Sequence, residues 1–290
     1  MQQPLPPEAN LLPHTEQFIH RAHAIEFKRP SEASELPPLP PNFEIDPEEP
    51  EFIQTCRKRP YYGQEGIFTT NWDQTRWRTY LDAYYRLTEE VDIQVGRLLE
   101  TLQDTGLEDN TLIIFTSDHG ETLGDHGLIQ KGCRFYEGLV RVPLIFSLPG
   151  RVLSKLRCDA LVELLDLAPT FLELAGIDVP ERMQGKSLLP ILQGEAPPQY
   201  HKDFVRCEYY DALDAPDGTL ASMYRDQRYK LVVYHGHECG ELYDLTEDPE
   251  EFDNLWNEPE TQPLKLKLVK RSFDATVQAM DRGPRRIGPM

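Results

Sequence analysis

The chain has 290 residues and a formal charge of −19, and 39% of its residues are hydrophobic. A chain of this length can bury a sizeable core, as one large domain or two smaller ones, and its composition is that of a globular protein. Its acidic surface repels phosphate backbones and anionic lipid, which excludes nucleic acid and membrane surfaces as expected partners. No run of about 18 apolar residues occurs, so no membrane span is expected.

The five cysteines are odd in number, widely scattered and without CxxC spacing. This pattern indicates neither a disulfide framework nor a structural zinc site. The opening residues, MQQPLPPEAN, lack the basic and apolar regions of a secretory signal. As written, the chain is therefore expected to be cytoplasmic, whereas a full-length parent with its own signal could be periplasmic or secreted. The compartment stays open.

The amino-terminal part of the chain is rich in proline. Twelve of the 25 prolines fall within residues 1–60. Because proline fixes φ and lacks an N–H donor, this stretch is expected to form neither regular helices nor central strands. We predict an extended segment that lies over another part of the molecule.

From residue 71 on, apolar residues recur at steps of three and four, with charged residues between them. This spacing predicts one long amphipathic helix, capped by Asn71 or Asp73 and ending near Gly106. The apolar positions are Trp77, Leu81, Tyr84, Val91, Val95, Leu98 and Leu102.

Two apolar runs follow this helix. Residues 111–116 include four large apolar residues in a row, which predicts a strand buried on both faces, as in a parallel sheet. A second buried strand is expected at residues 142–148, and helical segments at 159–167 and on to Ala175. Helix, strand, loop, strand and helix in this order predict an α/β core, with a mostly parallel sheet flanked by helices, over residues 61–200.

Residues 201–290 show a different pattern, with short aromatic runs separated by turn residues. They predict a small antiparallel subdomain with strands near residues 204–209, 222–224, 229–234 and 241–243 and a turn at His235-Gly236. A closing helix at residues 264–280 is expected to pack on this sheet. Its apolar positions are Leu264, Leu268, Phe273 and Val277.

The residues with the clearest chemistry stand just after the first predicted strand. Asp118 and His119 follow its carboxyl end, where loops of open α/β sheets form ligand sites. A carboxylate oxygen and a neutral imidazole both suit a divalent cation, which would polarise an ester oxygen. Lys131 supplies a compact cation for an oxygen of the same group. The alternative is that Asp118 caps a helix and His119 is an ordinary surface residue.

Two other groups of polar residues are not expected to belong to the metal site. His235, His237 and Cys239 in HGHECG lie beside a predicted turn and are more simply solvated loop residues. Asp125 and His126 repeat the Asp-His pair, and could line a substrate pocket or serve the loop's structure.

Several blocks together carry a family resemblance. SDHGETLGDHG is followed by KG and then by RFYEGLVRVPLIFSLPG, VELLDLAPT, QGKSLLP, YKLVVY and ELYDLTEDP, in this order. This arrangement resembles the sulfatase family of the alkaline phosphatase superfamily. The resemblance implies an alkaline-phosphatase/sulfatase-like α/β fold, a small carboxyl-terminal antiparallel sheet plus helix, and hydrolysis of sulfuric esters. The expected substrate is a sulfated carbohydrate or a small aryl sulfate ester.

The resemblance also implies roles for three residues. Asp118 matches a metal ligand, and Lys131 matches the catalytic lysine that contacts the sulfate or leaving-group oxygen. His119 occupies the neighbouring ligand position, which is Asn in many sulfatases and His in a branch that includes phosphonate monoester hydrolases. One divalent ion is expected. Calcium is the usual ion in the family, and an imidazole ligand also suits manganese or zinc.

Other family features have no counterpart in this sequence. None of the cysteines or serines stands in the C-x-P-S-R, C-x-A-x-R or S-x-P-S-R pattern that provides the nucleophile, and the early Asp-Asp metal ligands are absent. We therefore expect residues 61–200 to be the carboxyl-terminal part of a sulfatase catalytic domain, truncated and inactive alone. The alternatives are a phosphonate monoester or phosphodiester hydrolase, and a non-catalytic remnant of the fold. Oligomeric state and substrate identity stay open.

Overall fold

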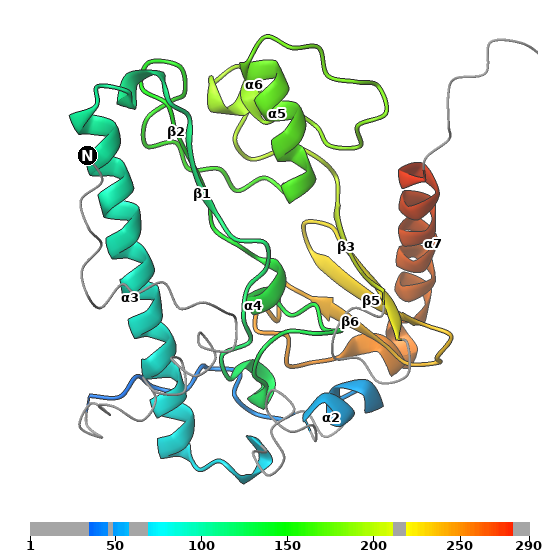
Figure 1. Cartoon of the computed structure of the whole chain (residues 1–290). Helices are drawn as coiled ribbons and strands as arrows, with labels where there is room; N and C mark the ends of the chain where they lie inside the picture. Colours follow the sequence, from blue (N-terminus) through cyan, green and yellow to red (C-terminus); the bar gives the residue numbers. More distant parts are fainter. Residues whose placement is uncertain (1–34, 46–48, 58–68, 211–218, 281–290) are drawn as a thin grey trace, which may run out of the picture.

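The structure is a computed structural model that describes residues 35–45, 49–57, 69–210 and 219–280. A long helix stands beside a two-stranded ribbon on one side of the molecule, and a four-stranded sheet with its own helix forms the other side (Figure 1). The helices are α2 (Glu51–Arg57), α3 (Gln74–Asp104), α4 (Glu137–Val140), α5 (Leu167–Leu174), α6 (Leu189–Leu192) and α7 (Gln262–Ala279). The strands are β1 (Ile113–Thr116), β2 (Leu144–Ser147), β3 (Val205–Tyr210), β4 (Leu220–Arg225), β5 (Tyr229–His235) and β6 (Gly240–Asp244).

The long helix α3 confirms the sequence prediction at both ends. Asp73 is its N-cap, and the Asp73 carboxylate accepts the N–H of Arg76 at 2.7 Å. Gly106, with φ of +69°, turns the chain away two residues after the last helical residue, a conformation that favours glycine. Of its large apolar side chains, the ones buried are Trp77 and Leu81 in the first turns. Among the described helices, none combines the length and apolar character of a membrane span.

The strands β1 and β2 form where the sequence predicts them, but they are antiparallel. Thr116 pairs with Leu144 and Ile113 with Ser147, because the segment between the strands leaves and re-enters at the same end of the pair. A parallel pair would need a crossover to the opposite end. Burial on both faces was also predicted and is wrong: Phe115 is 41% exposed, since the described strands β1 and β2 pair only with each other.

The helix expected at residues 159–167 is not formed over its first half. The N–H groups of Asp159 and Ala160 both donate to the carbonyl of Pro198 rather than to a helical turn. A 3-10 turn covers Leu164–Asp166, and the regular helix α5 begins after it. Glu163 has extended φ and ψ and forms a capping box with Asp166, so the helical region begins only after Glu163.

Most of the proline-rich stretch lies outside the described residues. Residues 35–45 are irregular, as predicted, but α2 contradicts the expectation that no regular helix forms before residue 60. The reason is the position of Pro50. It directly precedes the first helical residue, where a missing N–H breaks no helical hydrogen bond, and residues 51–57 contain no proline.

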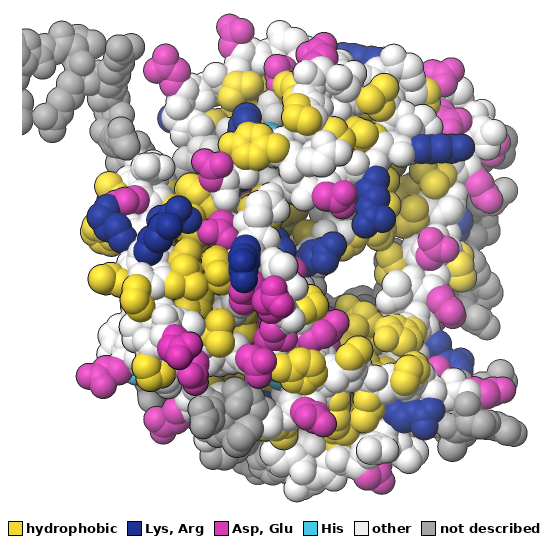
Figure 2. Space-filling model, turned by 180° about the vertical axis from the view of Figure 1, so that it is seen from behind, with side chains coloured by type: hydrophobic (Ala, Val, Ile, Leu, Met, Phe, Trp, Pro, Cys, Tyr) yellow, Lys and Arg dark blue, Asp and Glu magenta, His cyan; other side chains and the backbone are white. Residues whose placement is uncertain are grey.

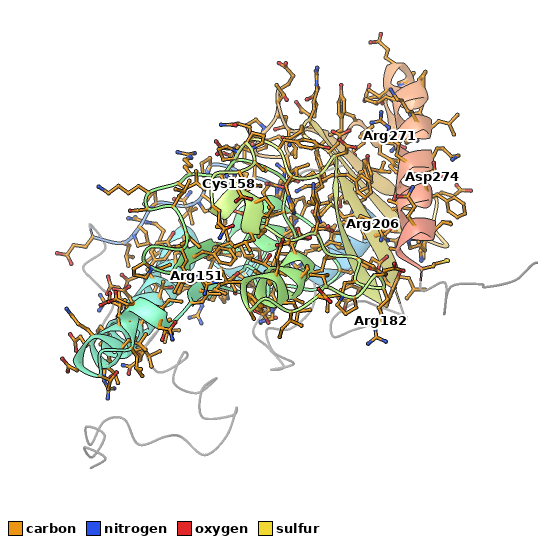
Figure 3. All side chains as sticks on the ribbon, turned by 90° about the horizontal axis from the view of Figure 1, so that it is seen from above. Arg151, Cys158, Arg182, Arg206, Arg271 and Asp274 are labelled. Carbon is orange, nitrogen blue, oxygen red and sulfur yellow. The ribbon has the colours of Figure 1, made fainter. Side chains whose placement is uncertain are left out.

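The carboxyl-terminal sheet confirms its prediction: β3, β4, β5 and β6 are adjacent in that order and pair antiparallel throughout. One face packs on α7 through a cluster that includes Leu231, Leu242 and Leu268. Arg206 of β3 also reaches α7, where Nη2 donates to Thr276 at 3.0 Å (Figure 3). The expected packing of Phe273 and Val277 is wrong, because the side of α7 that meets the sheet is that of Leu268, Ser272 and Ala275.

The two sides of the molecule are joined through the segment before α4. Cys133 and Phe135 are buried in a cluster with side chains of β4 and β5. Lys230 of β5 is fully buried, and its Nζ lies 2.6 Å from Glu137 and 2.7 Å from Glu251. The carbonyl of Phe135 accepts a hydrogen bond from the same Nζ at 2.9 Å. The chain that follows Lys131 is therefore anchored on the carboxyl-terminal sheet.

Candidate active site

The loop that leaves β1 is held tightly against α4. The N–H of Gly120 donates to the carbonyl of Leu139 at 2.8 Å. A Cβ atom at Gly120 would lie 1.9 Å from the carbonyl oxygen of Gly138, which only glycine avoids. This close approach fixes the two residues before it, Asp118 and His119, at the end of the strand.

In Asp118 and in His119, one polar side-chain atom makes a hydrogen bond within the loop and the other is available to bind a metal ion. Asp118 Oδ1 accepts the N–H of His119 at 3.0 Å, and the Ser117 hydroxyl lies 3.4 Å from it. His119 Nδ1 lies 2.8 Å from the carbonyl of Gly120, so Nδ1 carries the proton. The remaining atoms, Asp118 Oδ2 and His119 Nε2, are 3.6 Å apart. They present two lone pairs at one place.

The environment of Asp118 keeps its carboxylate charged. Slight desolvation acts to raise the pKa of Asp118, but the hydrogen bond from the His119 backbone and the nearby imidazole outweigh it. The net result is a pKa of Asp118 below its ordinary value. An ionised, exposed carboxylate is the form in which aspartate binds a divalent cation.

The donor set fits part of a metal site. A carboxylate oxygen and an imidazole Nε2 at 3.6 Å can share one cation, since two atoms that coordinate the same ion at about 2.1 Å lie roughly 3 Å apart. Among the described residues no group of three or more His, Cys, Asp or Glu side chains could hold a metal. The part of the chain that the structure describes therefore offers two donors here, fewer than the four to eight that divalent cations take up.

The segment from residue 121 to 134 is a compact loop that presents Lys131. Thr122 donates to the Gln130 carbonyl through both its N–H and its hydroxyl, at 3.1 and 2.8 Å. Arg134 Nη2 donates to the carbonyls of Ile129 at 3.1 Å and Lys131 at 2.5 Å. The backbone on both sides of the Lys131 side chain is thus fixed by hydrogen bonds.

Glu121 connects the two halves of the candidate site. Desolvation raises the pKa of Glu121, while the nearby positive charges of Lys131 and Arg134 are the main effects that oppose this rise. Its Oε1 is buried and has no hydrogen-bond partner among the described residues. Sequence reasoning missed Glu121; its place three residues after Asp118 in SDHGE was the available signal.

Asp125 and His126 belong to the loop's internal structure. The His126 ring stacks on Tyr136 with centroids 3.9 Å apart, and burial lowers the pKa of His126 to about 4. The N–H of His126 donates to the carbonyl of Asn42 at 2.7 Å, and its carbonyl accepts from Arg57 at 2.6 Å. Burial raises the pKa of Asp125 to about 6. These contacts favour a role of Asp125 and His126 in the structure of the loop over a place in a substrate pocket.

The histidines of HGHECG stand at the end of β5 and in the turn that follows it. His235 closes β5, and its Nε2 lies 2.9 Å from the hydroxyl of Ser222 on the adjacent strand. Gly236 follows with φ of +85°, which makes the predicted turn.

Comparison with known proteins identifies the family. A family profile described as "Sulfatase" matches residues 46–177, and one described as "N-sulphoglucosamine sulphohydrolase, C-terminal" matches residues 124–278. The Delta 4,5-hexuronate-2-O-sulfatase of Bacteroides thetaiotaomicron is 32% identical over 249 residues, covering 83% of this chain and 50% of that protein. The chain belongs to the sulfatase family.

Solved structures agree with this assignment. A 2-O GAG sulfatase matches with a TM-score of 0.78 and 29% identity, over 90% of this chain and 58% of that one. A phosphonate monoester hydrolase from Silicibacter pomeroyi matches with a TM-score of 0.72 and 26% identity, over 87% of this chain and 52% of that one. The sulfatase-like fold class with a carboxyl-terminal antiparallel sheet is thereby confirmed, and the chain spans between half and three fifths of these relatives' length.

Proposed function

We propose that this chain is part of a metal-dependent hydrolase of sulfuric esters, in which Asp118 and His119 supply two ligands of one divalent cation and Lys131 contacts the sulfate or leaving-group oxygen. The observation that carries the proposal is the geometry of the Asp-His pair. One donor of each side chain is held by the loop, and the two free donors, Oδ2 and Nε2, lie 3.6 Å apart.

The roles of the residues follow from their contacts. The bound cation would polarise an ester oxygen and stabilise charge in the transition state. The Gly120 carbonyl holds the proton of His119 on Nδ1 and so directs Nε2 outward. Lys131 brings a positive charge to the same region, where its loop is fixed by Arg134. The buried carboxylate of Glu121 lies near Lys131 and balances part of its charge.

The proposed substrate is a sulfated carbohydrate. The relatives that support this class include an N-acetylglucosamine-6-O-sulfatase, 34% identical over 214 residues, and the hexuronate sulfatase named above. Both relatives come from Bacteroides thetaiotaomicron, and they act at different sulfate positions, so the proposal extends to the substrate class and not to one sugar. A small aryl sulfate serves as a general probe of the chemistry.

We further propose that the chain does not turn over sulfate esters by itself, because no residue of its sequence matches the formylglycine nucleophile or the first metal ligands. Purified chain is expected to hydrolyse 4-nitrophenyl sulfate no faster than buffer does. Hydrolysis at enzyme-like rates by the 290-residue chain would overturn this part of the proposal.

Metal binding tests the site directly, without turnover. Titration calorimetry of the purified chain with Mn²⁺ or Ca²⁺ is expected to show weak binding that Asp118→Asn and His119→Ala each weaken about tenfold or more. Asp109→Asn is the matched control, since Asp109 is an exposed acid at the other end of β1. Equal weakening by the control would mean that the cation binds to acidic surface in general.

Activity is tested by joining the chain to the portion of the hexuronate sulfatase that it does not cover. This chimaera is expected to hydrolyse aryl sulfate, and Asp118→Asn is expected to lower its kcat/KM by a factor of about 100 or more. Unchanged activity in the Asp118 variant would remove this residue from the site.

A second candidate is hydrolysis of phosphonate monoesters or phosphodiesters. The observation that favours it is the imidazole at position 119, together with the likeness to the phosphonate monoester hydrolase. Aryl sulfate and aryl phosphonate substrates assayed in parallel on the chimaera separate the two chemistries. A preference for phosphonate that His119→Asn reverses toward sulfate would favour the second candidate.

A further inference from the structure

Glu251 is buried where the carboxyl-terminal sheet meets α4, in a strained backbone conformation. It is 3% exposed, and its φ of +62° lies in the left-handed region that residues with a Cβ atom adopt at an energetic cost. Such strain persists where the surrounding contacts determine the conformation, and it is concentrated at functional sites. At Glu251 the carboxylate makes contacts of this kind.

The carboxylate of Glu251 holds the first residue of α4. Its Oε2 accepts the N–H of Glu137 at 2.7 Å, a group that a helix leaves without a partner of its own. Its Oε1 accepts a hydrogen bond from Lys230 Nζ at 2.7 Å, and the same Nζ lies 2.6 Å from the Glu137 carboxylate. Glu251 thus fixes α4 twice, once through the backbone and once through a buried cation.

The later residues of α4 hold the loop that carries Asp118 and His119. The carbonyl of Leu139 accepts the N–H of Gly120 at 2.8 Å, and a Cβ at Gly120 would lie 1.9 Å from the carbonyl oxygen of Gly138. The four residues of α4 span only about 6 Å along the helix axis, so a movement of the first residue reaches the last. Because Gly120 directly follows the Asp-His pair, the position of the pair depends on α4.

The same helix contacts the loop that presents Lys131. A Cβ at Gly138 would lie 2.3 Å from Asp125 Oδ2, so the helix and this side chain meet without room between them. Tyr136, the residue before α4, stacks on His126 with ring centroids 3.9 Å apart. In Figure 1, α4 lies between β1 and the carboxyl-terminal sheet. One short helix thus joins both parts of the candidate site to that sheet.

We infer that Glu251 is a positioning residue for the proposed metal site, and that it acts through α4 on the separation of the free donors of Asp118 and His119. Among the described residues, its carboxylate accepts hydrogen bonds from Glu137 and Lys230 and not from the pair itself. The two donors, 3.6 Å apart, bind one cation well only in a narrow range of geometry, so small shifts of their loop change the affinity. The inference rests on the proposed function for the roles of Asp118 and His119.

The substitution Glu251→Gln tests this arrangement with little change in volume. A carboxylate has two acceptor oxygens and an amide has one, so the hydrogen bond from Glu137 or from Lys230 is lost. Glu250→Gln is the matched control for charge, because Glu250 is the exposed neighbour. Acidic side chains are spread over the face seen in Figure 2, so the removal of one exposed charge changes the general attraction for cations little. Leu231→Ala is the control for stability, since Leu231 is buried on the α7 side of the same sheet.

Hydrogen exchange measures the support of the loop without metal or turnover. Labelling with [1-¹³C]histidine and [¹⁵N]glycine selects the amides of His-Gly pairs, which in this sequence are those of Gly120, Gly127 and Gly236. In Glu251→Gln the Gly120 amide is expected to exchange at least about tenfold faster, because an amide of a surface loop exchanges by local opening. Gly127, which donates within its own turn to Gly124 at 2.8 Å, is expected to keep its rate within about twofold. In both control variants, Gly120 is expected to stay within about twofold of the wild-type rate.

Mn²⁺ affinity measures the effect on the donors. The Kd of the full chain, followed by the EPR signal of free Mn²⁺, is expected to rise at least about fivefold in Glu251→Gln and less than about twofold in Glu250→Gln and Leu231→Ala. A urea transition of tryptophan fluorescence verifies that each variant is folded without urea, so a change in Kd belongs to folded molecules. Glu137→Gln is a milder second variant, which keeps its backbone bond to Glu251 and loses the charge beside Lys230. It is expected to give an intermediate effect in both measurements, and it decides the inference where Glu251→Gln does not fold.

Several outcomes would overturn the inference. One is a Gly120 exchange rate in Glu251→Gln within about twofold of wild type, and another is equal acceleration in Leu231→Ala, which would make Gly120 a reporter of overall stability. An Mn²⁺ affinity that Asp118→Asn weakens and Glu251→Gln leaves unchanged would refute the inference and keep the proposed function. Faster exchange at Gly120 in a chain that binds no Mn²⁺ would refute the proposed metal site and leave the support of the loop by Glu251 standing.

Discussion

The carboxyl-terminal sheet and the β1–β2 ribbon both contain large apolar side chains but differ in what surrounds them. In the sheet, Leu231, Val232 and Leu242 are 0% exposed. In the ribbon, Phe115 and Ile145 are 41% and 58% exposed. The sheet has four paired strands and α7 across one face, whereas the ribbon has two strands and an open side.

This difference separates a region that completes its own core from one that does not. Burial of a large apolar side chain stabilises a fold by about 1.5–3 kcal/mol, and among the described residues Phe115 and Ile145 of the ribbon do not contribute this stabilisation in full. The stability of the chain is therefore expected to reside in the carboxyl-terminal sheet and the segments anchored on it. Four measurements can break or sharpen this comparison.

The largest effect is expected at Lys230, which ties the two regions together. Lys230→Met leaves the carboxylates of Glu137 and Glu251 without their buried cation and is expected to destabilise the chain by about 4 kcal/mol. Urea unfolding followed by the fluorescence of the three tryptophans measures the change. Lys270→Met is the control, since Lys270 pairs with Asp274 on the exposed side of α7 (Figure 3) and should cost less than about 0.5 kcal/mol. Equal losses would show that the buried network contributes nothing special.

Core truncation should distinguish the two sets of strands almost as clearly. Leu231→Ala removes a fully buried side chain and is expected to cost about 3 kcal/mol. Phe115→Ala removes a larger side chain from the open ribbon and is expected to cost less than about 1 kcal/mol. The same urea experiment compares them. If the Phe115 variant loses as much as the Leu231 variant, the ribbon is covered after all and the comparison fails.

A pH dependence is expected in the carboxyl-terminal sheet, where Glu241 is buried. Burial raises the pKa of Glu241 from 4.5 to about 8, with the charge of Glu251 adding to the shift and the hydrogen bond from Tyr234 opposing it. The folded state therefore holds this proton more tightly than the unfolded state. The stability that Glu241 contributes is fully present below pH 4.5 and is lost as the pH rises toward 8.

The variant Glu241→Gln keeps the neutral side chain at every pH. Relative to the wild type, it is expected to gain on the order of 3 kcal/mol between pH 5 and pH 8, measured by urea unfolding at both values. A stability difference between variant and wild type that stays constant over this range would show that Glu241 does not titrate there.

The smallest effect is expected at the cap of α3. Asp73→Ala removes the acceptor for the Arg76 N–H and should weaken the first turn by about 1 kcal/mol. Hydrogen exchange of amides in α3 is expected to accelerate, while amides of β4 and β5 keep their rates. Uniform acceleration in both regions would mean that the chain unfolds as one unit, against the division drawn above.

The sequence predicted the elements well where local signals agree with long-range packing. The helix from Asp73 to Gly106 and the four carboxyl-terminal strands follow from spacing and turn residues alone. Residues 159–163 were misassigned because the helical region begins at the capping box of Glu163 and Asp166, and the segment before it is held by hydrogen bonds to the Pro198 carbonyl. Burial was misjudged at Phe115 because periodicity identifies an apolar face and not whether the chain contains its partner.

The candidate site was predictable only in part. The adjacency of Asp118 and His119 is a matter of sequence, and the structure adds that their free donors converge. The approach of Glu121 to Lys131 depends on how the loop between them closes, which no local pattern encodes. Family resemblance supplied the roles of Asp118, His119 and Lys131, and these remain predictions for the metal and activity measurements to decide.

The clamp around His126 sets a limit on how far the chain can be trimmed. Asn42 accepts the N–H of His126, and Arg57 donates to the His126 carbonyl. Two short upstream segments therefore support the loop that carries Lys131. A shortened version beginning after residue 57 would keep every element from α3 to α7 yet release that loop. The smallest portion of this protein that keeps this loop in place is thus expected to begin before Asn42.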